Sequence, residues 1–392
     1  MDNTLKRGAG ENPSPYYSVR ETRGHEDREF ELFSQLRHNL RALMSVTPRL
    51  AEQLEGIDIN SLQNRADLEA IPVVRKSTLM QQQHALRGAK EVSESVFGGF
   101  APVSWGQVAR VYGSPGPIYE LDTSRTDYWR MAQALYAAGV RPGMLVHNCF
   151  SYHFTPAGNM LETGALALGC TVFPGGIGQT ELQVKTMVDL RPDAYTGTPS
   201  FLKIIMEKAE ELGEKLDSLK HALFTGEAFT PTMRDWFAER GVDGYQCYGT
   251  ADLGLIAFET SARDGLVVAE DIILEIVRPG TNDPVADGEV GEVVVTTLNP
   301  DYPLLRFGTG DMSMLLSEPS SCGRTNQRIK GWMGRADQSI KVRGMFVHPE
   351  HVAELSKRLD GVSKARMVAS GKVGSDSLIL QLVRESGADE AW

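Results

Sequence analysis

The clearest hydrophobic pattern near the start of the chain has helical spacing. Between Glu26 and Leu54, phenylalanine, leucine and methionine side chains recur on one helical face, and Pro48 interrupts the run. This spacing predicts an amphipathic pair of helices whose apolar faces pack against a core. The preceding residues, 1 to about 24, are polar, and we expect them to be loosely held.

From Ser124 onward, helical periodicity alternates with short apolar runs of strand type. Helices are expected over 129–138, 158–168 and 182–190, and strands over 145–150 and 171–173. Short strands separated by helices are typical of a largely parallel α/β sheet, in which loops at the carboxyl ends of the strands carry the functional site. Farther along, strand patterns over 272–276 and 290–296 flank a turn-rich region and indicate a β-rich subdomain.

The last part of the chain reads as a separate small unit, because one helical segment, 349–359, is accompanied by strand-like runs. At 392 residues the chain exceeds the roughly 250 to 300 residues at which single cores stop growing. We therefore expect an α/β protein with a large N-terminal domain, built from mixed and parallel sheets. A small α+β domain is expected at the C-terminal end.

Composition narrows the class of protein. The formal net charge of −11 and the pI near 5.3 argue against a general surface for nucleic acids or anionic membranes, while a local basic pocket for phosphates stays open. The four cysteines show no metal-site spacing, which is typical of reduced thiols in the cytoplasm. No apolar run has the length of a membrane span, and the N-terminus lacks the pattern of a signal peptide. These features predict a soluble, cytoplasmic protein.

Two glycine-containing stretches late in the chain carry candidate chemistry. In the first, two glycines flank a threonine just before Asp311. Glycine tolerates backbone angles that branched residues do not, so this stretch predicts a tight strand end that presents one carboxylate, suited to hold a vicinal diol. In the second, Arg335 and Asp337 precede a strand-like segment that Gly344 closes. Either stretch alone is also consistent with ordinary hairpin turns.

Together, in this order and spacing, the two stretches resemble the ribose-binding Tyr-Arg-Thr-Gly-Asp motif and the Gly-Arg-x-Asp hinge of the adenylate-forming superfamily. The run Cys322-Gly-Arg-Thr is similar to the phenylacetate-coenzyme A ligase branch, and the resemblance covers nearly the whole chain. It implies that Asp311 and Arg335 hold the ribose end of ATP. It also implies that Asp337 is the hinge between a large domain over 1–336 and a small domain over 337–392. Gly344 is implied to leave room for the pantetheine of coenzyme A.

The stretch from Ser114 to Pro117 lies where this family has its phosphate loop. Ser114 offers a hydroxyl, and Gly116 permits the close approach of backbone donors to a phosphate. Pro115 and Pro117 cannot donate from their nitrogens, and the family's paired hydroxyls and lysine are absent. Its position between an apolar strand and a helical segment favours a modified nucleotide loop, although an isolated turn of this composition needs no ligand.

Two further stretches match the family's nucleotide motifs. Gly226, Glu227 and Ala228 stand at the adenine-side loop, and Tyr248 and Gly249 begin the Tyr-Gly-x-Thr/Ser-Glu motif. The resemblance implies that the Tyr248 ring stacks on adenine.

The same motif ends at Asp252, which the resemblance assigns to Mg²⁺, a hard cation that prefers oxygen ligands. This aspartate is one methylene shorter than the usual glutamate, and Ala251 lacks the usual hydroxyl. The phosphate contact therefore moves to Thr250 or is lost. Asp252, Thr250 and Arg335 are the candidate catalytic residues.

An acyl pocket is expected after the strand at 145–150. Tyr152, His153, Phe154 and Gly158 combine aromatic and small side chains that could line a flat apolar pocket. Aromatic residues filling a core beneath a loop would give the same pattern. His153 is either a group that orients the substrate or an ordinary hydrogen-bonded histidine.

The resemblance implies an ATP-dependent, AMP-forming carboxylic acid:coenzyme A ligase for an aryl or arylacetic acid such as phenylacetate. ATP, Mg²⁺ and coenzyme A are the expected cofactors, the acid is the expected partner, and a homodimer is one option for assembly. Two alternatives stay open: an adenylating enzyme whose acceptor is an amine or a carrier protein, and a decayed nucleotide- or acyl-binding protein. The family's late lysine has no match here, so we expect the small domain to be incomplete and the chain to be shorter than the natural protein.

Overall fold

The structure is a computed structural model that describes residues 14–87, 96–114, 117–336, 340–342, 345–347, 349–359, 361–370 and 377–384.

The predicted helix pair opens the large domain. Helix α1 (His25–Leu43) is followed by α2 (Pro48–Gln53), with Pro48 at the start of the second helix, where its missing N–H costs nothing. The buried face of α1, which includes Phe33 and Leu36, packs against Ile273 of the β-rich subdomain, as the spacing predicted.

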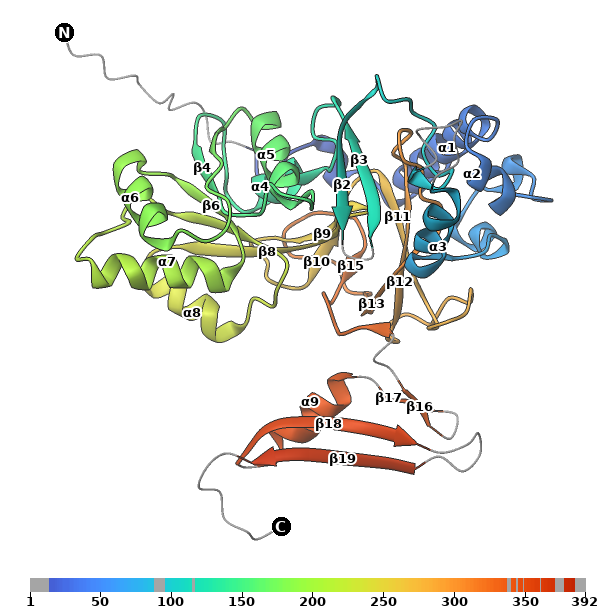
Figure 1. Ribbon diagram of the computed structural model, residues 1–392. Helices are drawn as coiled ribbons and strands as arrows, with labels where there is room; N and C mark the ends of the chain where they lie inside the picture. The colour runs from blue at the N-terminus through green and yellow to red at the C-terminus, as the bar shows by residue number, and fades with distance from the viewer. Residues whose placement is uncertain are drawn as a thin grey trace.

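A nine-stranded sheet forms the centre of the large domain (Figure 1). Its order is β14 (Leu315–Leu316), β15 (Arg328–Ile329), β10 (Leu266–Val268), β9 (Gly254–Glu259), β8 (Asp243–Thr250), β7 (His221–Phe224), β6 (Ala194–Gly197), β4 (Leu145–Asn148) and β5 (Thr171–Phe173). Strands β5, β4, β6 and β7 and the first half of β8 run parallel to one another. The second half of β8 pairs antiparallel with β9. Helices α4 (Met131–Ala137), α5 (Ala157–Ala167), α6 (Thr180–Leu190), α7 (Pro199–Glu211) and α8 (Pro231–Glu239) connect or flank the parallel strands. The prediction of a largely parallel α/β region is confirmed.

The β-rich subdomain is a four-stranded sheet in the order β1 (Val74–Arg75), β13 (Phe307–Ser313), β12 (Gly291–Thr297) and β11 (Ile272–Val277). Strand β1 pairs parallel to β13, while β13, β12 and β11 are antiparallel. Helix α3 (Lys76–Leu86) begins directly after β1. Short helices η1 (Val19–Thr22), η2 (Ile59–Ser61) and η3 (Arg65–Ala70) complete the N-terminal part.

The segment predicted as a phosphate loop connects two strands of a hairpin. Strands β2 (Val108–Ser114) and β3 (Ile118–Thr123) pair antiparallel, with Ser114 opposite Ile118 next to the turn. The expectation that a helical segment follows this turn was wrong, because the residues after it continue in a paired strand and the next helix begins only at Met131.

The segment before α1 is held in place from residue 14 onward, contrary to the prediction that residues up to about 24 are loose. Glu21 is buried, and Arg324 donates from Nε to its carboxylate at 2.6 Å. The same guanidinium donates from Nη2 to the carbonyl of Pro15 at 2.9 Å. Polar composition misled the prediction because a buried ion pair, which leaves no hydrophobic pattern in the sequence, helps to anchor this segment.

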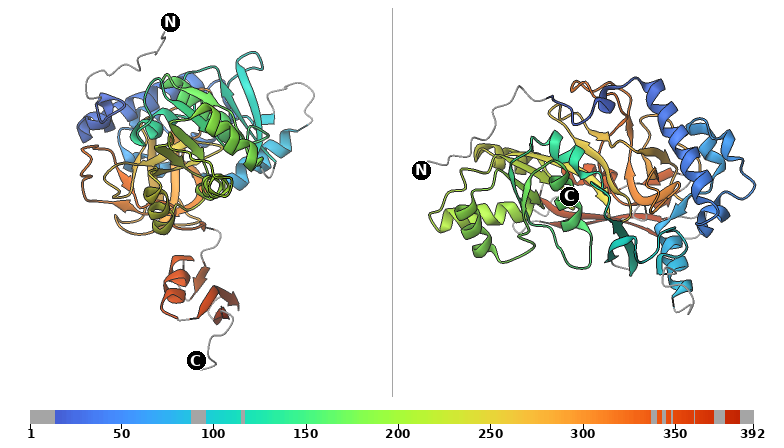
Figure 2. Two further views of the ribbon diagram at one scale, coloured as in Figure 1. Left: turned by 90° about the vertical axis from the view of Figure 1, so that its left-hand side faces the viewer. Right: turned by 90° about the horizontal axis from the view of Figure 1, so that it is seen from above.

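The described C-terminal elements are β16 (Ile340–Val342), β17 (Met345–Val347), α9 (Pro349–Lys357), β18 (Val362–Ser370) and β19 (Ser377–Arg384). Strands β16 and β17 form one antiparallel pair, and β18 and β19 form another. These elements are drawn apart from the large sheets in two perpendicular views (Figures 1 and 2), and they give the α+β composition that was expected.

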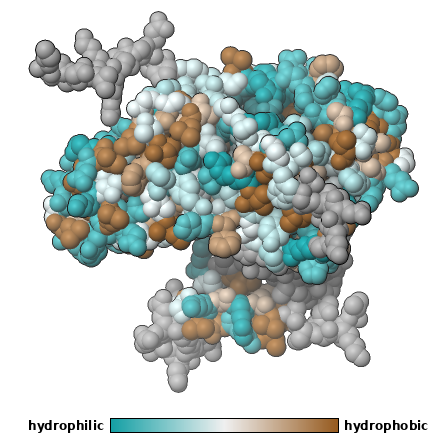
Figure 3. Space-filling model, turned by 45° about the horizontal axis from the view of Figure 1, so that its top comes forward, coloured by the Kyte–Doolittle hydropathy of each residue, from teal (hydrophilic) through white to brown (hydrophobic). Residues whose placement is uncertain are grey.

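The exposed surface is mixed in character. Over the part of the chain that the structure describes, no helix combines the length and apolar composition that crossing a membrane requires. Exposed apolar side chains include Leu166, Ile177, Leu182 and Leu190 on or next to α5 and α6. On the face shown in Figure 3, hydrophobic patches are interrupted by hydrophilic ones.

Candidate nucleotide site

A bulge in β13 presents the carboxylate that the sequence singled out. Glu292 of β12 pairs with Met312 and Val294 pairs with Gly308, so Val293 stands opposite the three residues between them. The Thr309 hydroxyl donates to the Val293 carbonyl and accepts from the Asp311 amide, both at 3.0 Å. The motif therefore lies within a strand, and not at a strand end as predicted, and the threonine side chain fixes the bulge.

Three donors surround the Asp311 carboxylate, which is 8 % exposed. The Tyr248 hydroxyl donates to Oδ2 at 2.9 Å, while Trp332 Nε1 and Arg335 Nη1 donate to Oδ1, each at 3.1 Å. Backbone bonds between Met312 and the segment 333–334 hold the tryptophan and the arginine beside the bulge. The structure thus brings together Asp311, Tyr248 and Arg335, which lie far apart in the chain.

The environment of Tyr248 keeps its hydroxyl protonated. Burial, followed by the negative charge of Asp311, raises the pKa of this phenol well above its ordinary value. The neutral hydroxyl can then donate to the carboxylate. Because the residue is only 9 % exposed, little of the ring that was expected to stack on adenine is open in this structure.

Asp252 lies in a buried turn after β8. Lys76 Nζ donates to its Oδ2 at 3.0 Å, and its Oδ1, also buried, has no hydrogen-bond donor among the described residues. Thr250, the other candidate of this turn, accepts the Leu253 amide at 3.2 Å, which fixes the turn that carries Asp252. A buried carboxylate oxygen without a donor suits a hard cation, so the residue fits the Mg²⁺ assignment chemically.

A second buried carboxylate, Glu120 of β3, is close enough to Asp252 for their charges to interact. Burial, followed by the negative charge of Asp252, raises the pKa of Glu120 to about 8. The Ser114 hydroxyl donates to Glu120 Oε2 at 3.1 Å, so the one hydroxyl of the depleted loop is already engaged. Glu120 was not among the residues that the sequence singled out, because nothing in its local pattern distinguishes it from a strand residue.

A cavity of about 440 Å³ lies beside the bulge. Its lining includes Lys76, Thr309, Gly310 and Arg335. Gly310 has φ of +75°, and a Cβ at this position would approach Arg335 Nη2 to 2.8 Å. Glycine suits this backbone conformation, which other residues rarely adopt, and a side chain here would displace the guanidinium.

The residues predicted for the acyl pocket divide into two groups. Asn148 Nδ2 donates to the Tyr152 hydroxyl and to the Gly158 carbonyl, both at 2.8 Å, which joins these two residues to the end of β4. His153 and Phe154 are exposed, and Phe154 is 83 % exposed at φ of +61°. In this structure neither side chain lines an enclosed pocket, because the turn directs both outward.

The predicted adenine-side loop follows β7 and is exposed over Gly226, Glu227 and Ala228. The Glu227 carboxylate accepts from the Ser200 amide and hydroxyl at 2.7 and 2.8 Å, which ties the loop to the start of α7. Gly249 lies at a register shift between β8 and β9. Gly116, Asp337 and Gly344 lie outside the described residues.

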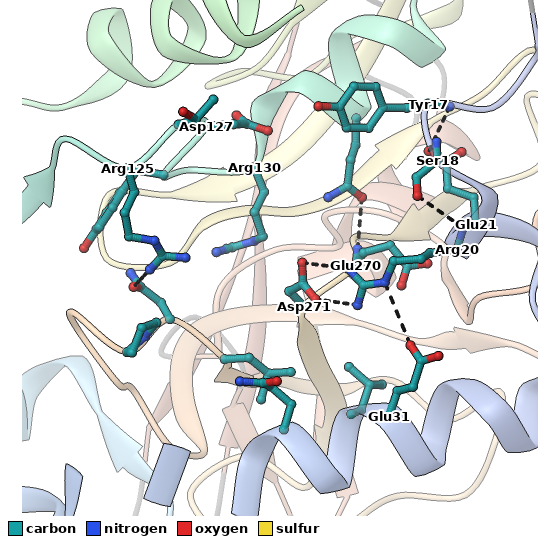
Figure 4. A pocket seen from close by; sticks show the side chains of 18 of the residues that line it. Tyr17, Ser18, Arg20, Glu21, Glu31, Arg125, Asp127, Arg130, Glu270 and Asp271 are labelled. Atoms are coloured by element: carbon teal, nitrogen blue, oxygen red, sulfur yellow. Dashed lines mark hydrogen bonds and ion pairs between the residues drawn. The ribbon is translucent and has the colours of Figure 1, made fainter. Parts of the chain in front are cut away.

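A larger cavity, of about 900 Å³, lies elsewhere (Figure 4). None of the predicted site residues lines it. Several of its charged side chains are already paired. Arg20 makes a bidentate ion pair with Asp271, with distances of 3.1 and 2.6 Å, and Glu270 pairs at 2.7 Å with Arg23, which lies outside the lining. We interpret this cavity as part of the interface between the N-terminal segment and the rest of the large domain.

Sequence reasoning also missed Lys76 and Trp332. Lys76 is the first residue of α3, and its position beside the bulge depends on the pairing of β1 with β13, which no local pattern encodes. Trp332 comes three positions before Arg335 in the sequence. Its position beside Asp311 depends on the pairing of residues 333–334 with Met312, which no local pattern encodes.

Comparison with known proteins identifies the family to which this chain belongs. Residues 125–299 match the AMP-binding enzyme family. A phenylacetate-coenzyme A ligase of Thermus thermophilus is 34 % identical over 76 % of this chain and 67 % of its own length. A second phenylacetate-coenzyme A ligase, from Aromatoleum evansii, is 32 % identical over 78 % of this chain and 70 % of its own length. The chain belongs to the phenylacetate-coenzyme A ligase branch of the AMP-binding enzymes.

Solved structures agree with this ligase fold. An open conformation of 2-hydroxyisobutyryl-CoA ligase, in complex with 2-HIB-AMP and CoA, has a TM-score of 0.83 at 24 % identity and covers 97 % of this chain and 90 % of its own. The same ligase in its postadenylation state has a TM-score of 0.79 at 25 % identity, over 97 % and 83 % of the two chains. The α/β fold expected from the sequence is thus confirmed for this chain.

Proposed function

We propose that this AMP-forming acid:coenzyme A ligase activates an aryl or arylacetic acid such as phenylacetate. The observation that carries the proposal is the Asp311 carboxylate, held in the β13 bulge and surrounded by Tyr248, Trp332 and Arg335. The motif that the resemblance assigns to ribose binding is thereby assembled around one buried acceptor.

In the proposed complex, Asp311 accepts hydrogen bonds from the two ribose hydroxyls of ATP. An ionised carboxylate offers about four lone-pair sites, and three are engaged by protein donors. Trp332 is 58 % exposed, so its indole can move aside and release a second site for the ribose. Arg335 stays beside the carboxylate and adds positive charge near the nucleotide.

Mg²⁺ is part of the proposal, with Asp252 as its protein ligand. The donor-free Asp252 Oδ1 supplies the hard oxygen that this cation prefers. When bound with ATP, the ion would neutralise phosphate charge.

Two half-reactions follow from the family resemblance. The acid's carboxylate oxygen forms a bond to the α-phosphorus while the bond to pyrophosphate breaks, and the coenzyme A thiol then forms a thioester at the acyl carbon as AMP leaves. Both steps need positioning and charge stabilisation more than covalent chemistry. Thr250 and Arg335 are proposed to steady the phosphates, while Tyr152 and Gly158 lie on the proposed acyl side.

The remaining assignments complete the proposal. The domain boundary after residue 336, the hinge at Asp337 and the coenzyme A contact at Gly344 rest on the resemblance alone. So do the phosphate-loop role of Gly116 and the adenine-side role of 226–228. We also propose a cytoplasmic location and, as one option, a homodimer.

A screen of aryl and arylacetic acids for pyrophosphate release, with and without coenzyme A, tests the proposal. We expect release to depend on an aromatic acid and AMP to appear together with a thioester when coenzyme A is added. Pyrophosphate release whose turnover needs an amine or a carrier protein would identify a different acceptor. Absence of release with every acid, from a protein that still binds ATP, would identify a decayed nucleotide-binding protein.

A further inference from the structure

Strand pairing places Lys76 beside the nucleotide motif. In the parallel pair of β1 and β13, Val74 is opposite Phe307 and Arg75 is opposite Gly308. Lys76 follows immediately as the first residue of α3, so the chain leaves the sheet level with the β13 bulge. A lysine far from the motif in sequence is therefore fixed next to it in space.

Lys76 reaches two environments at once. Its ammonium donates to the buried Asp252 carboxylate at 3.0 Å, while its own side chain is 34 % exposed. It also lines the 440 Å³ cavity together with Thr309, Gly310 and Arg335. A long flexible stem allows the ammonium to exchange one anionic partner for another without movement of the backbone.

The cavity presents cations to a ligand, while most of their carboxylate partners lie behind it. The charged side chains of its lining are Arg75, Lys76, Arg335 and Glu292, and the glutamate is paired with Arg75 at 3.1 Å. The partners of Lys76 and Arg335, which are Asp252 and Asp311, are not part of the lining. An anionic ligand such as a polyphosphate in the cavity would therefore meet the cations before the carboxylates that neutralise them.

The phosphate loop cannot supply this charge. Residues 114–117 read Ser-Pro-Gly-Pro and contain no lysine, and the Ser114 hydroxyl is occupied by Glu120. The triphosphate of ATP needs a cation from another part of the chain.

We propose that Lys76 is that cation: its ammonium leaves Asp252 and binds the β- and γ-phosphates of ATP, in place of the missing phosphate-loop lysine. This inference rests on the proposed function and adds to it a residue from an element outside the family motifs. AMP lacks these two phosphates, so Lys76 distinguishes ATP from AMP. Asp252, released from Lys76, becomes available on both oxygens.

The test is calorimetric binding of ATP and of AMP to the full chain without divalent metal. Because a charge-assisted contact to phosphate is lost, Lys76→Met should weaken ATP binding by about tenfold or more and change AMP binding by less than about twofold. Lys203→Met, which removes a lysine from an ion pair on α7, is the matched control and should change neither. Equal weakening of ATP and AMP, or no change for ATP, would overturn the inference.

A second variant keeps the test decisive if Lys76→Met folds poorly because Asp252 is left unpaired. Asp252→Asn releases Lys76 from its ion pair, so metal-free ATP binding should be maintained or strengthened. The double variant, Lys76→Met with Asp252→Asn, should lose that binding again. Loss of metal-free ATP affinity in Asp252→Asn alone would contradict the inference. If the variants show this pattern of ATP binding but the wild-type protein releases no pyrophosphate with any acid, only the proposed function is overturned.

Discussion

A single carboxylate, Asp311, accepts from three donors that come from two separate stretches of the chain. If it is the ribose acceptor, Asp311→Asn removes the charge while keeping the shape of the side chain. A hydrogen bond to a charged group typically contributes about 1.5 to 3 kcal/mol, so ATP and AMP should each bind about tenfold or more weakly. Calorimetry measures the affinity, and the thermal midpoint of unfolding serves as the control for folding. Unchanged affinity in a folded variant would remove Asp311 from the nucleotide site.

Glu120 predicts a pH dependence of stability. Its pKa is raised by burial and by Asp252 from an ordinary 4.5 to about 8 in the folded chain. As pH rises through this range the unfolded chain releases the proton first, so the unfolded state binds fewer protons and the free energy of unfolding falls. The stabilising contribution is complete below the lower pKa and is lost as pH passes the upper one.

Glu120→Gln removes this titration. Urea unfolding at a series of pH values should show the variant gaining stability relative to wild type as pH rises across the window. A difference between the two proteins that stays constant with pH would mean that Glu120 titrates normally in the folded chain.

At the scale of elements, the sequence predicted the units and missed how they meet. Helical spacing identified α1 and α2, and short apolar runs between helical segments identified two of the parallel strands, β4 and β5, because these signals are local. The hairpin of β2 and β3, the bulge at 309–311 and the contact of Lys76 with Asp252 depend on pairing between distant strands. No local pattern encodes such pairing, so these parts of the site needed the structure.

The bulge itself makes a prediction at Gly310. Gly310→Ala combines an unfavourable backbone conformation, of order 1 to 3 kcal/mol, with a contact of the new Cβ at 2.8 Å from Arg335. Gly288→Ala is the matched control, because that glycine has φ of +79° but a Cβ added there would meet nothing within 4 Å. Both variants should lose stability in urea unfolding, and only Gly310→Ala should also lose ATP affinity. Equal ATP affinity in the two variants would mean that the bulge does not position Arg335 for the nucleotide.

For the whole molecule, length and the change in pattern late in the chain predicted a large α/β domain and a small α+β unit, and the resemblance placed the proposed boundary after residue 336. The family resemblance supplied the reaction class, and shared ancestry explains why these few motifs carried it. Neither source indicated that Arg324 holds the segment before α1 through Glu21 and the Pro15 carbonyl, because contacts between distant parts of the chain leave no periodic signal.

The proposed hinge predicts a separation of the two half-reactions. Asp337→Pro should fix φ near the boundary of the domains and hold the small domain in one orientation. We expect one of two assays, pyrophosphate release or thioester formation from a supplied acyl-adenylate, to fall much more than the other. Equal effects on both assays would count against Asp337 as the pivot.

The central claim is that the acid's own carboxylate attacks the α-phosphorus of ATP. Mass spectrometry of AMP formed from phenylacetate labelled in both carboxyl oxygens with oxygen-18 tests it directly, in the presence of coenzyme A. The proposed route transfers one labelled oxygen to each AMP and leaves pyrophosphate unlabelled. AMP without label, or label found in inorganic phosphate or pyrophosphate, would contradict activation through an acyl-adenylate.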